Sequence, residues 1–303
     1  MNRPLYSLVV LTAFFLSGCG GSKTTTLPPP QSAHVDHVFL VVLENHSFSQ
    51  VLGNPAMPFL NSLASAHALA AGYFANAHPS IPNYFMLSTG NLQTNDDNFM
   101  GTITDDNLVR AVTGAGKSWK AYIQSLPSAG YTGPNVGAYL KHHNPFAYLS
   151  DVTESAAQAG HMVPFQQFSA DLNAGMLSDF VYLLPDSQND AHDCPGGAPS
   201  CTDDDKLMAA DNWLRDNIDP LLKSPNFSNS VLIITFDESL LSDTAGGGGH
   251  VITVLVGPHV KSVFRSSTTF QHQSLLRLIL QLLEVTDMPG AAASADSMGE
   301  FFQ

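Results

Sequence analysis

Apolar segments with two different periodicities alternate along most of the chain. Short continuous runs rich in β-branched residues predict buried strands, and longer stretches with apolar positions every three or four residues predict helices. The predicted strands are 35–43, 68–75, 118–123, 179–184, 231–236 and 251–256. The predicted helices are 58–66, 82–88, 107–114, 204–222 and 271–285. This alternation indicates βαβ units, and therefore an α/β fold with a mostly parallel sheet.

The stretch 125–167 does not follow this pattern. It is rich in Gly, Pro, Tyr and His and has no clear period, so we expect an insertion that covers the site and shapes its pocket. His142 and His143 lie within it, and we expect both to be surface loop residues rather than ligands.

Polar side chains follow four of the predicted strands at the point where each strand ends. They are Glu44 and Asn45, His78 and Ser80, Asp186, Asp190 and His192, and Asp237 and Glu238. Ligands of open α/β sheets bind outside the carboxyl ends of the strands. Two adjacent carboxylates repel each other and need a cation or a shared proton. The sequence therefore predicts a site for a hard metal ion at this edge of the sheet.

Ser80 and the glycine run 246–249 have two interpretations each. Pro82 can open a helix, which would put Ser80 near a helix N-terminus, where backbone N–H groups stabilise anions. A hydroxyl beside a divalent cation can ionise and attack phosphorus, but Ser is also a favoured helix N-cap. A predicted strand follows the glycine run, so it is not a nucleotide-binding loop. We expect a flexible turn that lets His250 approach the site.

Taken together, these segments resemble the phosphoesterase family. That family contains bacterial acid phosphatases and phosphatidylcholine-cleaving phospholipases C, and it belongs to the alkaline-phosphatase-like superfamily. The motifs that carry the resemblance are ENHSF at 44–48, HPSIPNY at 78–84, the run 186–193, FDE at 236–238, GHV at 249–251 and GPHV at 257–260. The resemblance implies a three-layer α/β/α sandwich and a phosphoric ester hydrolase.

The resemblance also implies a role for each motif residue. A divalent metal ion would have four ligands, Glu44, Asn45, Asp237 and Glu238. Ser80 would attack phosphorus and form a phosphoseryl intermediate, and Asn83 would hold a nonbridging phosphate oxygen. Three histidines would stabilise the phosphate or protonate the leaving oxygen: His78, His192 and His250.

We expect one metal ion rather than two. A second site could be built from Asp186, Asp190, His192 and His250, but the same histidines could serve without metal. The oxygen-rich ligands suit Mg²⁺, Ca²⁺, Mn²⁺ or Zn²⁺.

The beginning of the chain predicts export and lipid anchoring. Arg3, the apolar stretch 8–16 and the sequence LSGC at 16–19 resemble a bacterial lipoprotein signal peptide over 1–18. Lipidated Cys19 would hold the protein to a membrane, with 19–34 as a flexible tether and 35–303 as the catalytic domain. This predicts secretion across the inner membrane and a place in the bacterial cell envelope, periplasmic or surface. Secretion with an unmodified Cys19 is the alternative.

The two remaining cysteines and the net charge limit the possible partners. Cys194 and Cys201 are expected to form a local disulfide in an oxidising compartment. The chain has 26 Asp and Glu against 12 Lys and Arg, a net charge of −14, which argues against nucleic acid as a partner. A phosphate-ester substrate stays compatible, because one local cationic site can override the global field.

Acid phosphatase-like hydrolysis of phosphate esters is the expected activity, and phospholipase C action on phospholipid head groups is the alternative. A sulfatase-like enzyme is disfavoured because Tyr84, rather than arginine, follows the sequence SIPN at 80–83. A non-catalytic, ligand-binding surface lipoprotein of the same fold is a third possibility. The complete set of proposed metal ligands argues against it.

Overall fold

The computed structural model describes Met1 and residues 35–303. The predicted tether 19–34, and all of the predicted signal peptide except Met1, lie outside the described residues. Lipidation of Cys19 therefore stays a prediction. Within the described part of the chain, no helix has the length and apolar character needed to cross a bilayer.

An eight-stranded sheet organises the described residues, in the order β4-β3-β5-β1-β6-β7-β2-β8. The strands are β1 His37–Leu43, β2 Ala68–Ala70, β3 Trp119–Ile123, β4 Met162–Pro164, β5 Phe180–Leu184, β6 Ser230–Phe236, β7 Thr253–Val256 and β8 Phe264–Ser266. Among these strands β7 alone runs antiparallel to its neighbours, β6 and β2. The predicted α/β fold with a mostly parallel sheet is confirmed.

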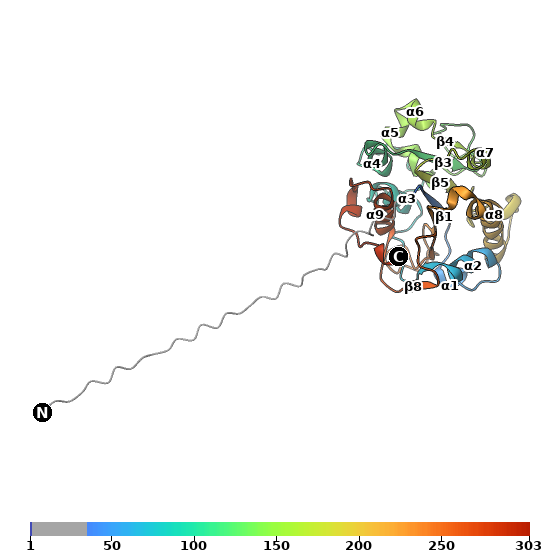
Figure 1. The fold of residues 1–303 in the computed structure, drawn as a ribbon. Helices are drawn as coiled ribbons and strands as arrows, with labels where there is room; N and C mark the ends of the chain where they lie inside the picture. Colours follow the sequence, from blue (N-terminus) through green and yellow to red (C-terminus); the bar gives the residue numbers. More distant parts are fainter. Residues whose placement is uncertain (2–34) are drawn as a thin grey trace.

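Helices cover both faces of this sheet, which makes the fold a three-layer sandwich (Figure 1). The helices are α1 Phe48–Val51, α2 Pro58–Ala66, α3 Ile81–Thr89, α4 Leu108–Gly114, α5 Ser150–Thr153, α6 Ala156–Ala159, α7 Gln167–Ala174, α8 Asp203–Lys223 and α9 His272–Leu282. Helix α3 packs beside α9, and α2 packs beside α8 on the other side of the sheet. The two layers bury both faces of the central strands.

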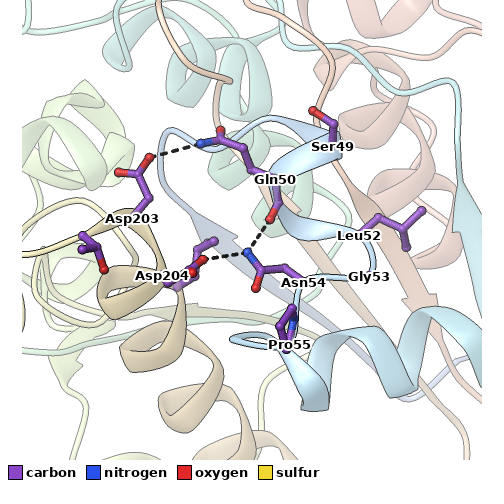
Figure 2. Close-up of a pocket in the computed structure, with 10 residues that line it drawn as sticks. Ser49, Gln50, Leu52, Gly53, Asn54, Pro55, Asp203 and Asp204 are labelled. Carbon is purple, nitrogen blue, oxygen red and sulfur yellow. Dashed lines mark hydrogen bonds between the residues drawn. The ribbon is translucent and has the colours of Figure 1, made fainter.

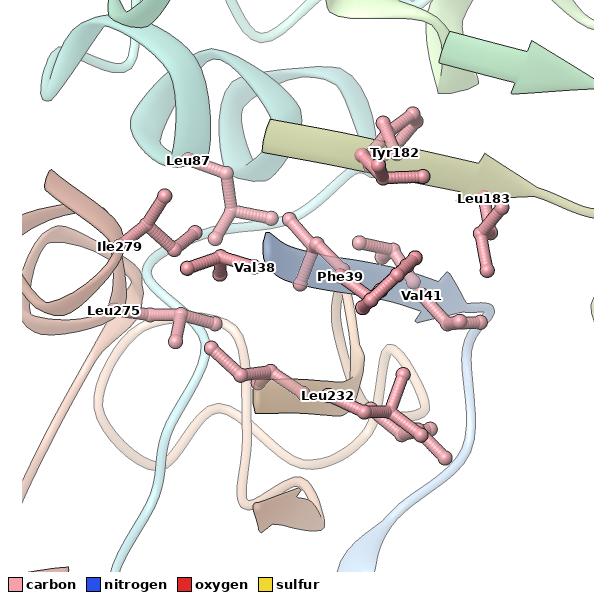
Figure 3. Close-up of a cluster of buried hydrophobic side chains, with 14 of the residues drawn as sticks. Val38, Phe39, Val41, Leu87, Tyr182, Leu183, Leu232, Leu275 and Ile279 are labelled. Carbon is pink, nitrogen blue, oxygen red and sulfur yellow. The ribbon is translucent and has the colours of Figure 1, made fainter. Parts of the chain in front are cut away.

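The central strand β1 is buried on both faces. Residues 38–43 are each at most 2% exposed, which explains why this stretch reads as a continuous apolar run rather than an alternating one. Figure 3 shows Leu87 of α3 and Leu275 and Ile279 of α9 gathered around Val38. Burying one such side chain stabilises the fold by about 1.5–3 kcal/mol. Dense packing on both faces therefore fixes the position where β1 ends.

Two predicted segments differ from the structure. The strand predicted over 68–75 ends at Ala70, and beyond it Tyr73 and Phe74 make only isolated bridges to Phe270 and His250. The stretch 125–167 is not only an irregular insertion, because it supplies the edge strand β4, which pairs with β3. The short α5 and α6 also lie in it.

The predicted disulfide is present between Cys194 and Cys201. It joins the segment after β5 to the start of α8, whose N-cap is Thr202.

An ion pair between α7 and β3 gives a test of the fold. The Asp171 carboxylate accepts hydrogen bonds from Lys120 Nζ and Tyr122 Oη, each at 2.7 Å. Burial opposes ionisation, but these two bonds hold the pKa of Asp171 below its usual range. A lowered pKa contributes stability that is present above the unfolded-state pKa and is lost as the pH falls through the folded-state pKa.

We therefore expect Asp171→Asn to lower the free energy of unfolding by about 1.5–3 kcal/mol at neutral pH, the usual range for hydrogen bonds to charged groups. The loss should shrink toward pH 3. Urea unfolding at both pH values measures it, and an equal loss at both would contradict the ion pair.

Candidate active site

The C-terminal ends of β1 and β6 place the predicted metal ligands side by side. Leu43 pairs with Phe236 in register, so the next residues, Glu44 and Asp237, are neighbours at the sheet edge. Glu44 and Asp237 are each 0% exposed. Asn45 has a φ of 49°, a left-handed conformation that Asn tolerates better than most residues. Its backbone N–H donates to Asp237 Oδ1 at 3.3 Å.

The Ser80 hydroxyl points into this carboxylate cluster. Its Oγ lies 3.1 Å from Glu44 Oε2, 3.2 Å from Glu238 Oε1 and 3.4 Å from Asn45 Oδ1. The hydroxyl does not cap α3, and the first amide of that helix, Ile81 N–H, instead donates to a carboxylate oxygen of Asp97. Ser80 therefore occupies the N-cap position of α3, as both interpretations expected, but its hydroxyl faces the carboxylates instead of capping the helix.

The cluster has the chemistry of a divalent-cation site. Asp237 Oδ2 is buried without a hydrogen-bond partner, and Asn45 Oδ1 faces the acceptor oxygens of Glu44 and Asp237. Reversing the Asn45 amide would let its nitrogen donate to Glu44 Oε2 and Asp237 Oδ1, but Asp237 Oδ2 would still lack a partner. Converging carboxylate and amide oxygens are the ligands that hard cations prefer.

The electrostatics of the cluster point the same way. Burial, followed by repulsion from Asp237, raises the pKa of Glu44 well above its usual range. Burial, followed by repulsion from Glu238, does the same to the pKa of Asp237. Burial raises the pKa of Glu238 to about 8. Burial and mutual repulsion therefore favour the protonated carboxyl groups, and a bound cation would favour the ionised ones.

A second group of side chains lies on the other oxygen of Glu44. Tyr84 donates a hydrogen bond to Glu44 Oε1, and His143 Nε2 lies 3.4 Å from the same oxygen. The Tyr84 and His143 rings stack at 5.5 Å. His143 is 2% exposed, so the prediction of a surface histidine was wrong. The sequence could not predict the burial of His143, because this residue lies in a single 3-10 turn, 141–143. Such a short segment has no periodicity to indicate which side chains face inward.

Asp190 and His192, from the segment after β5, complete this side. Asp190 Oδ2 lies 3.1 Å from His143 Nδ1, and its Oδ1 accepts from the backbone N–H of His192 at 2.8 Å. The His192 ring lies 5.3 Å from that of His143 and its Nδ1 is 2.9 Å from Asp193 Oδ1. One ligand atom from each of Glu44, His143 and His192 lies within 4.8 Å of the others. This trio can hold phosphate oxygens or a cation.

Two predicted site residues have structural roles instead. Asn83 is 0% exposed, and its Oδ1 accepts from the backbone N–H groups of Asn76 and Ala77 while its Nδ2 donates to Ala77 O. Because its amide is used to shape the loop before Ser80, it does not present a donor to phosphate. Asp186 accepts from Ser125 Oγ at 2.6 Å and from Asn189, which makes it part of the turn after β5.

His250 also lies apart from the carboxylate cluster. Its Nε2 lies 2.9 Å from Ala71 O, and its ring stacks between Phe48 at 4.3 Å and Phe74 at 4.8 Å. The expected approach of His250 to the site is corrected: aromatic packing holds this ring elsewhere. The alternative second metal site, built from Asp186, Asp190, His192 and His250, is therefore not assembled as a set, because Asp186 and His250 are engaged elsewhere.

His78, by contrast, reaches the cluster. Its Nδ1 makes a short contact with Glu238 Oε2, and its Nε2 lies 2.9 Å from Asp243 O. Both ring nitrogens are thus engaged with protein groups.

A pocket of about 550 Å³ lies where the loop after α1 meets the start of α8 (Figure 2). Gln50 donates to Asp203 and Asn54 to Asp204 across it. None of the cluster carboxylates or histidines lines this pocket. It is therefore separate from the candidate chemistry.

Comparison with known proteins identifies the family to which this constellation belongs. Residues 54–286 match the phosphoesterase family. The chain belongs to the phosphoesterase family. The match begins after Glu44 and Asn45, so the place of these two residues in the site rests on the geometry above. Membership makes the protein a phosphoric ester hydrolase.

Other members of the phosphoesterase family resemble the chain over most of its length. A phosphatidylinositol-3-phosphatase of Mycobacterium tuberculosis is 30% identical over 92% of this chain and 88% of its own. A phosphate-repressible acid phosphatase of Penicillium chrysogenum is 28% identical over 84% of this chain, which spans 65% of that relative.

Solved structures share the fold of this chain. An alkaline phosphatase superfamily protein from Vibrio parahaemolyticus matches 86% of this chain and 69% of its own, with a TM-score of 0.62 at 13% identity. A murine ectonucleotide pyrophosphatase/phosphodiesterase matches 88% of this chain and 100% of its own, with a TM-score of 0.59 at 13% identity. The alkaline-phosphatase-like fold expected from the sequence is confirmed.

Removal of metal should lower stability most at high pH. Groups with a raised folded-state pKa contribute stability that is present below the unfolded-state pKa and is lost as the pH rises through the folded-state pKa. For Glu238 this window runs from its usual value of 4.5 to about 8. We expect the Tm of chelator-treated protein to fall between pH 5 and pH 8, and added divalent cation to raise the Tm more at pH 8 than at pH 5.

Thermal unfolding at the two pH values, with and without Mg²⁺, Ca²⁺, Mn²⁺ or Zn²⁺, measures this difference. Glu238→Gln should flatten the pH dependence of the chelated protein. A cation effect on the Tm as large at pH 5 as at pH 8 would contradict the displacement of carboxyl protons by the bound cation.

Proposed function

We propose that this phosphoesterase is a metal-dependent phosphatase that transfers the phosphoryl group of a phosphate monoester to Ser80 and then to water. The observation that carries the proposal is the position of Ser80 Oγ, within 3.4 Å of oxygens from Glu44, Asn45 and Glu238. A serine hydroxyl buried among carboxylates, at the edge where α/β sheets bind ligands, suits a nucleophile better than a packing group.

The chain's own residues prepare the attack. A divalent cation held by Glu44, Asn45, Asp237 and Glu238 would favour the ionised hydroxyl and offset the charge of the phosphate. The single Ser80 O–H can donate to Glu44 Oε2 at 3.1 Å or to Glu238 Oε1 at 3.2 Å, which aims the oxygen. The Ser80 proton passes to the carboxylate oxygen that accepts its hydrogen bond. The bond from Ser80 Oγ to phosphorus then forms as the bond from phosphorus to the leaving alcohol oxygen breaks.

His143 and His192 are placed to serve the phosphate. Both lie on the side of Glu44 that carries Tyr84. Asp193 accepts from His192 Nδ1, so Nε2 of that partly exposed ring gives a proton to the leaving oxygen when the ring is an imidazolium, which becomes a neutral imidazole in the step. By microscopic reversibility the same ring takes a proton from the water that hydrolyses the phosphoserine. His143 Nε2 is buried without a hydrogen-bond partner, and a phosphate oxygen would supply one.

The names of the relatives favour monoesters as substrates. The mycobacterial relative is named a phosphatidylinositol-3-phosphatase and the fungal relatives are named acid phosphatases. We therefore propose soluble phosphate monoesters or a phosphorylated lipid head group over the diester cleavage of a phospholipase C. A cell-envelope location through lipidated Cys19 stays a proposal supported by the sequence of 1–19.

Ser80→Ala should abolish turnover of an artificial aryl phosphate, with a fall in kcat of about 10³-fold or more, because it removes the nucleophile. Ser88→Ala is the matched control, since Ser88 is a buried serine of the same helix whose hydroxyl bonds only helix carbonyls. Rapid quenching and intact-mass measurement of wild-type protein should detect a phosphorylated Ser80. Full activity of Ser80→Ala would refute the mechanism, and a substrate panel with phosphatidylcholine tests the diesterase alternative.

His143→Ala should lower kcat by about 10²–10⁴-fold, the usual range for a positioned proton-carrying or donor group. His67→Gln is the control, because His67 lies beside α2 rather than at the cluster. Steady-state kinetics on the same aryl phosphate measure both variants. Unchanged kcat in His143→Ala would remove this histidine from the site.

A further inference from the structure

The segment between β6 and β7 lies directly against the loop that carries His78 and Ser80. A Cβ atom added to Gly247 would meet Asn76 O at 2.1 Å, and one added to Gly248 would meet Ala77 O at 2.4 Å. Gly247 also has a φ of +110°, which favours glycine. The sequence predicted a flexible turn for this glycine run, and these close contacts correct that prediction. The run allows two backbones to touch.

The carboxylate of Asp243 closes this segment into a compact loop. Its Oδ2 accepts from His250 N–H at 3.0 Å and from Ser239 Oγ at 3.2 Å, and its Oδ1 accepts from Ala245 N–H at 3.1 Å. Ser239 Oγ is in turn 2.6 Å from Ser47 Oγ, just after the end of β1. One side chain thus joins both ends of the loop and ties them to the residues that follow β1.

The backbone carbonyl of the same residue reaches His78. Asp243 O lies 2.9 Å from His78 Nε2. Because a carbonyl can only accept, Nε2 carries a proton. The hydrogen bond of Nε2 to Asp243 O orients the imidazole ring so that Nδ1 faces Glu238 Oε2. The other oxygen of this carboxylate, Glu238 Oε1, then faces Ser80 at 3.2 Å.

We propose that Asp243 is a positioning residue for the nucleophile: its carboxylate shapes the loop so that its own carbonyl fixes His78, and His78 fixes the carboxylate of Glu238 against Ser80. This inference rests on the proposed function of Ser80 and Glu238. Asp243 touches none of the reacting atoms. Outer residues that orient ligand side chains in this way usually change activity by about 10–100-fold when they are removed.

The test compares Asp243→Ala, Asp243→Asn and Leu241→Ala in the full chain with saturating divalent cation. Leu241 is 72% exposed in the same loop, so its variant should keep wild-type kinetics. Asp243→Ala should lower kcat by about 10–100-fold and change KM much less, since the loop arranges the nucleophile rather than the substrate. Asp243→Asn keeps one acceptor oxygen and should recover part of kcat.

A spectroscopic readout separates positioning from general loss of structure. In long-range ¹H–¹⁵N spectra the Nε2–H of His78 should be a distinct hydrogen-bonded signal in wild-type protein and in Leu241→Ala. It should shift or vanish in Asp243→Ala. If Asp243→Ala does not fold, the same two measurements on Asp243→Asn decide, with intermediate values expected.

Wild-type kcat, or an unchanged His78 signal, in the folded Asp243 variants would overturn the proposal. This failure is distinguishable from failure of the proposed function. An inactive Ser80→Ala together with a fully active Asp243→Ala would leave the phosphoryl transfer intact and remove only the positioning role. An active Ser80→Ala would overturn both.

Discussion

Glu44, Asp237 and Glu238 are held out of water at the adjacent ends of two parallel strands. The effective penalty for burying an ionised carboxylate is several kcal/mol, and repulsion between neighbouring carboxylates adds to this penalty. The strands cannot relieve the repulsion by moving apart, because β1 and β6 are paired along their whole length and packed on both faces. Protonation of the carboxyl groups and binding of a cation are the two ways in which the repulsion within this cluster can be relieved.

Glu44 links two different environments within this arrangement. One of its oxygens faces Ser80, and the other meets Tyr84 and His143. The carboxylate is thus shared between the oxygen-rich side, which suits a cation, and the histidine side, which suits a phosphate. A change on either side reaches the other through a single side chain, so substitutions on the two sides are expected to be non-additive.

Site residues that directly follow a regular strand could be predicted from the sequence, and those in irregular segments or inside a helix could not. Glu44 and Asp237 could be predicted as neighbours because the carboxyl ends of parallel strands meet at one edge. His143 could not, since it lies in a single turn of an aperiodic segment, and Tyr84 is hidden in the interior of a helix. Asn83 and His250 carry plausible site chemistry, but hydrogen bonds to a loop and stacking on two phenylalanines use them elsewhere. Composition cannot distinguish these uses, because they depend on contacts between distant segments.

The direction of β1 has a consequence for where the enzyme works. The described chain enters the domain at Val35 and Asp36, where Asp36 N–H donates to Asn229 O, and β1 then runs across the sheet to Glu44. A seven-residue strand spans roughly 23 Å, so the entry point and Ser80 lie at opposite edges of the sheet. If the N-terminus is anchored as its sequence predicts, the tether joins the domain at the edge of the sheet opposite the site. Dissolved esters would then reach it freely, whereas a lipid of the same membrane would be reached only after the domain turned over on its tether.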